Sequence, residues 1–136
     1  ARAGSIKNPL FRGGGTTFGP EPRDYTQKLN HKVKQLARRS ALSYKAKEKA
    51  IIVLDGVKMD GPKTKDFAGM MSGLKLADSK TLMVLSAPNE AVYMSSRNLA
   101  KHRVMVATDV STYDIMNCNT LIFVDDAHKV VEGMLK

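Results

Sequence analysis

The segment GVKMDGPKT, which runs from Gly56 to Thr64, is the part of the chain closest to a catalytic motif. It follows an apolar run and precedes a helical pattern, which is the setting of a nucleotide-binding P-loop. A P-loop needs G-x-x-x-x-G-K followed by Ser or Thr, because consecutive backbone N–H groups cradle the phosphates. Here Pro62 separates Gly61 from Lys63, and proline has no N–H to donate. We therefore interpret the segment as a strand-to-helix turn and keep a nucleotide-binding α/β enzyme as an alternative function.

The glycine-rich run FRGGGTTFGPEPRDY, residues 11–25, is a second candidate for phosphate binding. A dinucleotide-binding G-x-G-x-x-G must follow a strand and open a helix. Counted from Gly13, the sixth position is Phe18, and no apolar run precedes the glycines. The run therefore does not predict a nucleotide site.

The remaining reactive side chains form no recognisable set. Cys118 is the single cysteine, so no intrachain disulfide or cysteine-based zinc site is expected, and a buried thiol is the simplest interpretation. Asp125 and Asp126 could bind a metal at a strand end, but Asp126 fits better as the cap of the last helix. The three histidines are scattered, at His31, His102 and His128. We nominate no catalytic residue, metal site or cofactor.

The chain carries a formal net charge of +9 at pH 7, and the excess lies entirely in its first third. Residues 1–49 contain 12 Lys or Arg and 3 Asp or Glu, whereas residues 50–136 contain 10 of each. This asymmetry indicates a polyanionic partner for the first third, with nucleic acid the first choice and an anionic membrane a distant second. No apolar run is long enough to span a membrane, and no membrane partner is expected.

Residues 1–24 show no strand or helix period and contain five glycines and three prolines. This composition buries too little apolar surface to offset the ordering entropy, so we expect an extended, mobile arm. Cations interleave with aromatic side chains along it, at Arg2, Lys7, Phe11, Arg12, Phe18, Arg23 and Tyr25. Cations neutralise phosphates and aromatic rings stack on bases. The residues alone leave an RNA-binding arm, a DNA-binding arm and a solvated tail open.

Residues 25–49 are predicted to form a basic amphipathic helix. One apolar stripe recurs at helical spacing, consisting of Leu29, Val33, Leu36, Ala37, Ala41 and Tyr44. The cations fall mainly on the opposite arc, at Lys28, Lys32, Lys34, Arg38, Arg39, Lys45 and Lys49. We expect the apolar stripe to dock on the domain and the cationic face to meet a polyanion. A transcriptional regulator that binds nucleic acid through this helix is a further alternative.

Residues 50–136 alternate between short apolar runs and helical patterns. Continuous apolar runs are typical of parallel strands covered on both faces, and they predict strands at 50–55, 81–86, 103–107 and 120–125. Helices are predicted at 65–75, 90–101, 111–116 and 127–136, with Asn89 and Ser111 as N-caps. This alternation predicts a three-layer α/β/α sandwich with a parallel sheet and right-handed crossovers.

Ordered motifs along the chain resemble those of a known family. R-x-G-S-I-K-x-P, G-G-G-x-x-F-G-P, P-R-x-Y and K-x-N-x-K follow one another in the first 32 residues. Further on come the turn DGPKT and the segment APNEAVYMSSRNLAKHRV, with its S-R-N-L core. Together these motifs resemble the bacterial-type L4 family of large-subunit ribosomal proteins, and the resemblance covers essentially the whole chain.

The resemblance implies a four-stranded parallel sheet with strand order 1-4-2-3 and a long basic loop that reaches deep into large-subunit ribosomal RNA. It also implies a cytoplasmic, non-enzymatic protein of early subunit assembly that contacts neighbouring ribosomal proteins and, in some bacteria, represses its own operon. Members of the family carry a further N-terminal segment. Residues 1–24 would then be the returning half of the loop, with Ala1 and Arg2 nearest the exit tunnel and its nascent peptide, and residues 25–136 the globular domain.

The family motifs also nominate residues for contact with ribosomal RNA. In the arm and the basic helix these are Arg2, Ser5, Lys7, Arg12, Gly13, Gly14, Arg23, Lys28, Lys32 and Arg39. Arg97 and Asn98, from the S-R-N-L core, are weaker nominees, because a position at the end of a helix explains them equally well.

Overall fold

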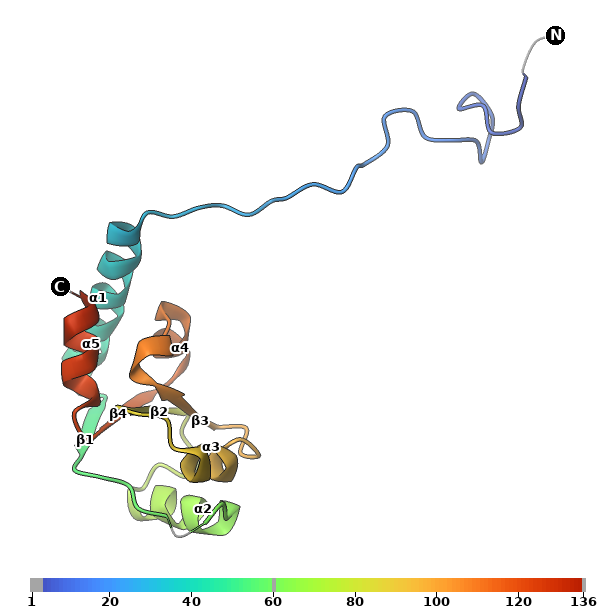
Figure 1. The fold of residues 1–136 in the computed structure, drawn as a ribbon. Helices are drawn as coiled ribbons and strands as arrows, with labels where there is room; N and C mark the ends of the chain where they lie inside the picture. The colour runs from blue at the N-terminus through green and yellow to red at the C-terminus, as the bar shows by residue number, and fades with distance from the viewer. Residues whose placement is uncertain (1–3, 60, 136) are drawn as a thin grey trace.

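A four-stranded parallel sheet forms the centre of the computed structural model, which describes residues 4–59 and 61–135. Its strands are β1 (Ile51–Leu54), β2 (Thr81–Leu85), β3 (His102–Val106) and β4 (Thr120–Val124). They lie in the order β1-β4-β2-β3, and every neighbouring pair is parallel (Figure 1). The predicted α/β class, the four strands and their 1-4-2-3 order are therefore confirmed.

Helices cover both faces of this sheet. On one face lie α1 (His31–Lys47), α4 (Thr112–Asn117) and α5 (Ala127–Leu135), and on the other lie α2 (Thr64–Gly73) and α3 (Glu90–Ser96) (Figure 1). A short 3-10 turn, η1 (Ala107–Asp109), follows β3. The predicted three-layer sandwich is confirmed. Among the described residues, no helix is both long and apolar enough to cross a membrane.

The central strands supply side chains to two separate cores. Leu82 and Val84 of β2 pack towards α1, α4 and α5, whereas Met83 and Leu85 pack towards α2 and α3. Successive side chains of a strand point to opposite faces, so one strand serves both cores. All five residues of β2 are buried, which explains why its sequence is continuously apolar instead of alternating.

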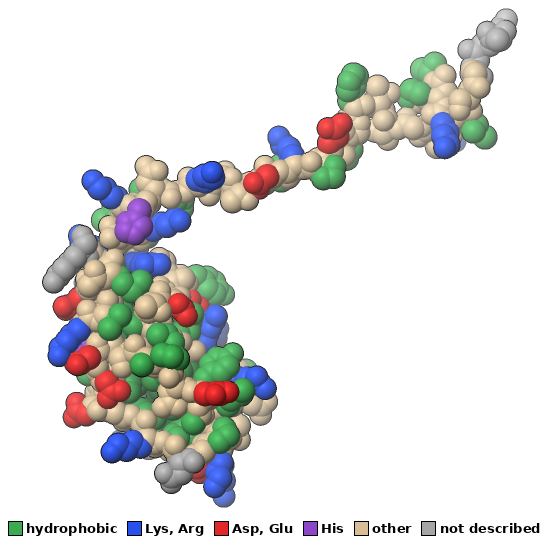
Figure 2. Space-filling view, viewed as in Figure 1, with side chains coloured by type: hydrophobic (Ala, Val, Ile, Leu, Met, Phe, Trp, Pro, Cys, Tyr) green, Lys and Arg blue, Asp and Glu red, His purple; other side chains and the backbone are tan. Residues whose placement is uncertain are grey.

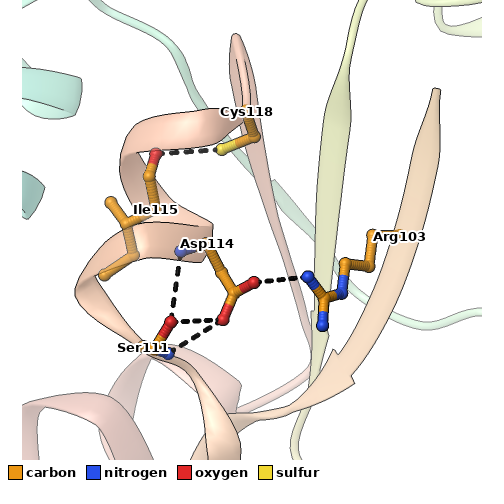
Figure 3. Close-up of polar contacts among 5 residues, drawn as sticks. All are labelled: Arg103, Ser111, Asp114, Ile115 and Cys118. Atoms are coloured by element: carbon orange, nitrogen blue, oxygen red, sulfur yellow. Dashed lines mark hydrogen bonds and ion pairs between the residues drawn. The ribbon is translucent and has the colours of Figure 1, made fainter. Parts of the chain in front are cut away.

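Helix α4 is tied to the sheet through Asp114 (Figure 3). Ser111 and Asp114 form a capping box at the start of the helix, which confirms Ser111 as an N-cap. The Asp114 carboxylate accepts hydrogen bonds from the Ser111 hydroxyl at 2.5 Å and from Arg103 Nη1 at 2.7 Å. Because Arg103 belongs to the edge strand β3, this ion pair fastens that strand to α4. Asn89 is likewise confirmed, since its side chain accepts from the Val92 N–H at 3.3 Å.

Helix α1 begins at His31, six residues later than the sequence predicted. Tyr25 and Leu29 are 73% and 61% exposed, so the tertiary packing that stabilises most protein helices is missing before residue 31. In addition, both the N–H and the hydroxyl of Thr26 donate to the Asp24 carboxylate, which favours a turn over a helix. The helical pattern over 25–30 is therefore not realised in this structure.

Helix α3 ends at Ser96, whereas the sequence predicted a helix up to Lys101. The hydroxyls of Ser95 and Ser96 donate back to backbone carbonyls of their own helix, at 2.7 and 2.9 Å. Such bonds compete with continuation of the helix. The N–H of Leu99 then bonds to the Ser96 carbonyl at 2.9 Å, which turns the chain towards β3 and packs Leu99 against the second core.

Candidate nucleic-acid interface

The described part of the arm, residues 4–24, and the following residues 25–30 contain no helix or strand and form a thin segment that leaves the domain at the start of α1 (Figure 1). Figure 2 shows Lys and Arg side chains distributed along it. The predicted RNA-contacting cations that the structure describes in this segment, Lys7, Arg12, Arg23 and Lys28, are exposed, and so is Lys32 in the first turn of α1. Arg2 lies outside the described residues, as does Ala1. The arm is therefore available for contact with a partner along its length.

The middle of the arm carries two local contacts around Tyr25. The Arg23 guanidinium lies over the Tyr25 ring, 4.4 Å from its centroid, which is a cation–π geometry. The Thr26 hydroxyl and then the Thr26 N–H hold the pKa of Asp24 below its ordinary value by hydrogen bonding to the carboxylate. These bonds favour the charged form of Asp24, which is adjacent to Arg23 in the sequence.

Residues 5–15 fold into a closed loop, which we call the arm loop. Backbone N–H···O=C bonds of 3.0 Å close successive turns over residues 5–8, 8–11 and 11–14. A further bond joins the Gly15 N–H to the Lys7 carbonyl at 2.9 Å and closes the loop. The side chains of Ser5 and Asn8 accept bonds from N–H groups two residues ahead, at 3.2 and 3.1 Å. This part of the arm is thus folded back, whereas the sequence predicted an extended conformation.

Two glycines allow the arm loop to close. Gly13 has φ +74°, in the left-handed region that favours glycine. A Cβ on Gly14 would lie 2.0 Å from the main-chain oxygen of Asn8, so a side chain there is incompatible with the closed loop. Contact between RNA and Ser5, Gly13 or Gly14 stays a prediction. The dipeptide Asn8-Pro9, typical of a turn start, is the sequence signal that would have found this loop.

Helix α1 docks on the domain with the face opposite to the predicted one. Val33, Leu36 and Tyr44 of the apolar stripe are 50–67% exposed. The side chains that approach the domain are those of Gln35, Arg38, Ala41, Leu42 and Lys45. The prediction that the apolar stripe docks on the domain was therefore wrong for these three residues, although Ala41 lies in the core as expected.

Side chains of α1 donate hydrogen bonds to backbone carbonyls at the C-terminal ends of α4 and α5. These bonds explain why the docked face contains polar side chains. Gln35 donates to the Met134 carbonyl at 3.3 Å, and Arg39 donates to the Leu135 carbonyl, both in the last turn of α5. Lys45 Nζ donates to the carbonyl of Cys118, the C-cap residue of α4, at 2.7 Å. Carbonyls at a helix C-terminus lack intrahelical donors and carry partial negative charge, so cationic and amide donors suit them.

These contacts change the interpretation of two cations. Lys45 was predicted to lie on the cationic face, but it is 7% exposed and also lies 3.8 Å from Glu48. Its ammonium group is bonded inside the fold, to the Cys118 carbonyl. Arg39, a predicted RNA contact, is exposed but is already engaged with α5. Lys32 and Lys34 remain exposed cations at the start of the helix.

Arg97 and Asn98 lie far from the arm in the fold. Arg97 is the C-cap residue of α3, which covers the sheet face opposite to α1, and both side chains are exposed. This matches the helix-end position that the sequence left open. Arg97 also lines a surface groove of about 880 Å³ with Tyr93 and Arg103, between α3 and the edge strand β3. The structure therefore does not bring these two residues together with the other predicted contacts.

The P-loop-like segment has the geometry of a turn. Lys63 is the N-cap residue of α2 with extended φ/ψ of −108° and 119°, and its N–H already bonds to the Gly61 carbonyl at 2.9 Å. Pro62 has no backbone N–H, so fewer N–H groups are available here to bind a phosphate than in a P-loop. Asp60 lies outside the described residues.

The other reactive side chains are buried or bonded within the fold and do not form a catalytic set among the described residues. Cys118 is buried, as predicted, and burial raises the pKa of its thiol. Burial also lowers the pKa of His102, whose Nδ1 lies 2.7 Å from the Thr81 hydroxyl. Asp126 precedes α5 and pairs with Lys129 at 2.7 Å, and this bond lowers its pKa. No group of three or more His, Cys, Asp or Glu side chains suited to a metal occurs within residues 4–59 and 61–135.

Comparison with known proteins identifies the family. The profile of the Ribosomal protein L4/L1 family matches residues 1–134. The chain is 48% identical to the large ribosomal subunit protein uL4 of Phocaeicola vulgatus over 99% of its length, and 50% identical to that of Parabacteroides distasonis over all of it. It spans 65% of the length of each of these relatives. With a sheet of the expected strand order and a match over nearly its whole length, the chain belongs to the ribosomal protein L4/L1 family.

Proposed function

We propose that this chain is a structural, RNA-binding constituent of the large ribosomal subunit in the cytoplasm and does not act as an enzyme. Large-subunit ribosomal RNA is its main partner, and neighbouring ribosomal proteins are further partners. The α/β domain stays near the subunit surface, and exposed cations of α1 meet RNA phosphates. The arm, residues 1–24, inserts between RNA segments near the exit tunnel and the nascent peptide. Binding takes place early in subunit assembly.

The exposed cations of the arm and of the residues up to the start of α1, which form no ion pair, are the observation that carries this proposal. In the described part of the chain, the ion pairs within 4.0 Å include none of Lys7, Arg12, Arg23, Lys28 or Lys32. Unpaired cations on a projecting arm are free to neutralise phosphates and release counterions. The names of the relatives, which are large ribosomal subunit proteins, favour ribosomal RNA over other polyanions.

Salt dependence of RNA binding tests the proposal directly. Deletion of residues 1–24 removes four cations. Since each phosphate contact contributes roughly 0.7 to 0.9 to the slope of log K against log salt, the slope should fall by about 3 while the domain stays folded. A matched variant with Lys58, Lys65, Lys75 and Lys80 replaced by Gln loses as much cationic charge from the α/β domain and should keep nearly the whole slope.

The outcomes separate this function from its alternatives. An unchanged slope after the deletion would show that the arm does not bind phosphates. Equal affinity for duplex DNA and ribosomal RNA at physiological salt would favour the transcriptional regulator. Tight ATP or GTP binding that is lost in Lys63→Ala would favour the nucleotide-binding enzyme.

A further inference from the structure

We infer that the groove between α3 and the edge strand β3 binds an extended segment of a partner protein, which joins the sheet as a fifth strand antiparallel to β3. The segment carries a cation, an apolar residue and a carboxylate at alternate positions, in this order along its chain. The groove lies on the α/β domain, far from the arm, so the inference does not depend on RNA binding by the arm.

Strand β3 has unpaired main-chain groups on its outer side, because it has a neighbouring strand on one side only. The Thr81 N–H donates to the Lys101 carbonyl at 2.9 Å, and Thr81 lies opposite His102 in the register of β2 and β3. Alternate residues of a parallel strand bond to the same side, so His102, Val104 and Val106 direct their main-chain groups outward. Among the described residues, no other element bonds to the Val104 N–H or carbonyl. Both groups are free to pair with an added strand.

The groove has the outer edge of β3 as one wall and one face of α3 as the other (Figure 1). Glu90 and Tyr93 of α3 and its C-cap residue Arg97 recur at helical spacing, line the groove and are exposed. The Val104 side chain packs in the second core, on the α3 side of the sheet. Directly opposite residues of antiparallel strands point to the same face. An apolar residue paired with Val104 therefore lies on the side of the half-exposed Tyr93 ring.

The two ends of the groove carry opposite charges. Glu90 and Asp109 lie at the end where α3 begins and β3 has ended, and Arg97 lies at the end where α3 stops. Within the described part of the chain, none of these three is in an ion pair within 4.0 Å. Arg103 also lines the groove but is paired with Asp114. A bound segment therefore gains from a cation at the first end and a carboxylate at the second.

Helix α3 sets the spacing of these charges along the segment. Glu90 and Arg97 are seven residues apart in the sequence. This separation corresponds to about 10 Å along a helix, or about three residues of strand. Since alternate residues of a strand share a face, a cation and a carboxylate four residues apart reach both ends with their flexible side chains.

The direction of the segment follows from the strand pairing. Antiparallel pairs are slightly more stable per residue than parallel pairs, and they let one residue exchange both main-chain bonds with Val104. In this direction the cation of the segment lies opposite Val106, near the acidic end, and the carboxylate lies opposite His102, near Arg97. The His102 N–H already donates to the Leu99 carbonyl at 3.2 Å, so only the His102 carbonyl is open to the segment there.

The test titrates the nitrogen-15-labelled full chain with an acetylated and amidated peptide, Thr-Lys-Thr-Val-Thr-Glu-Thr, and follows the amide chemical shifts. Saturable shifts should occur at Val104, Tyr93 and Arg97, with a Kd on the order of 100 μM. A peptide with Lys and Glu exchanged should bind about tenfold more weakly, because both charges then face like charges. N-methylation of the central valine should also weaken binding about tenfold, because the Val104 carbonyl loses its donor.

Variants of the chain test the charged ends without changing β3. Arg97→Glu should bind the first peptide about tenfold more weakly, since an attractive pair becomes a repulsive one. A peptide with Lys in place of Glu should restore the affinity of this variant. The matched control is Lys65→Glu, which reverses an exposed cation on α2 outside the groove and should leave the Kd unchanged.

Each other outcome would overturn part of the inference. Absence of shifts at Val104 up to about 1 mM peptide would overturn the added strand. Equal affinity for the two charge orders would overturn the assigned direction, and an equal loss in Lys65→Glu would show non-specific charge attraction. A Val104 shift that depends on protein concentration without peptide would identify a second copy of this chain as the occupant, and a short RNA duplex that competes with the peptide would identify RNA. The peptide titrations contain no RNA, so their failure leaves the proposed function untouched.

Discussion

Replacement of Asp114 by alanine should be among the most destabilising single changes outside the apolar core. The Asp114 side chain is only 6% exposed and accepts bonds from Arg103 at 2.7 Å and from the Ser111 hydroxyl at 2.5 Å (Figure 3). It also forms half of the capping box that starts α4. Alanine therefore removes a charged hydrogen-bond acceptor, a helix cap and an ion pair in one step.

The magnitude follows from the burial of each partner. Hydrogen bonds to a charged group contribute about 1.5–3 kcal/mol, and a helix cap contributes about 1 kcal/mol. Arg103 is 59% exposed, so its freed guanidinium is rehydrated and the larger penalty of an unpaired buried charge does not arise. We therefore expect a loss of about 3 kcal/mol, which corresponds to a decrease in Tm of roughly 10 °C for a domain of this size.

The matched control is Asp78→Ala. Asp78 pairs with Lys101 at 3.1 Å, a similar distance, but both side chains are more than half exposed. An exposed pair contributes about 0–1 kcal/mol, so this variant should unfold close to the unchanged chain. Urea denaturation followed by circular dichroism measures both values. If Asp114→Ala and Asp78→Ala lost equal stability, the assignment of a supporting role to the Arg103–Asp114–Ser111 contacts would be refuted.

Three other predictions concern buried groups. Lys45→Met should lower the free energy of unfolding by about 1–3 kcal/mol, measured by urea denaturation, because the Cys118 carbonyl loses its donor. The control Lys47→Met replaces an exposed side chain and should change the free energy of unfolding little. Burial lowers the folded-state pKa of His102, so its contribution to stability should be fully present above the unfolded pKa of about 6.5 and be lost as pH falls through the folded pKa. His102→Gln should therefore flatten this part of the pH profile of Tm. Cys118, buried and with a raised pKa, should react with iodoacetamide at pH 8 far more slowly in the folded chain than in urea, and equal rates would contradict its burial.

The strands could be predicted because a buried parallel strand has a simple sequence pattern. All five residues of β2 are buried. Four of them are apolar, and the fifth, Thr81, is hydrogen-bonded to His102, so nothing in the sequence competes with the strand assignment. Strand order came from the resemblance to the family. Apolar runs alone cannot give it, since any of the four runs could occupy the centre.

The docked face of α1 could not be predicted because periodicity finds a stripe but not its partner. Val33, Leu36 and Tyr44 form a better apolar stripe than the docked face, and yet they are exposed. The docked face was decided by carbonyls at the ends of α4 and α5, far along the chain, which need the donors of Gln35 and Lys45. A sequence pattern confined to one helix contains no information about those carbonyls.

The arm loop was missed for a different reason. Its stability depends on main-chain hydrogen bonds, and composition rules for residues 1–24 weigh only side-chain burial against chain entropy. Asn8, Pro9 and Gly13 favour turns of a few residues, whereas a composition is averaged over the whole segment and does not register such positions. The predicted contacts at Gly13 and Gly14 came from the family motif, and the structure supplies a physical reason why these positions need glycine.

The placement of charge connects the fold to the proposed function. Between residues 4 and 49, only Ala41 and Lys45 are buried, so the cation-rich third contributes very little to either core. Repulsion among its cations therefore acts on a segment that supplies few core side chains, and residues 50–136, which supply most of both cores, carry no excess charge. In the proposed function, RNA removes this repulsion and supplies the packing that the arm lacks.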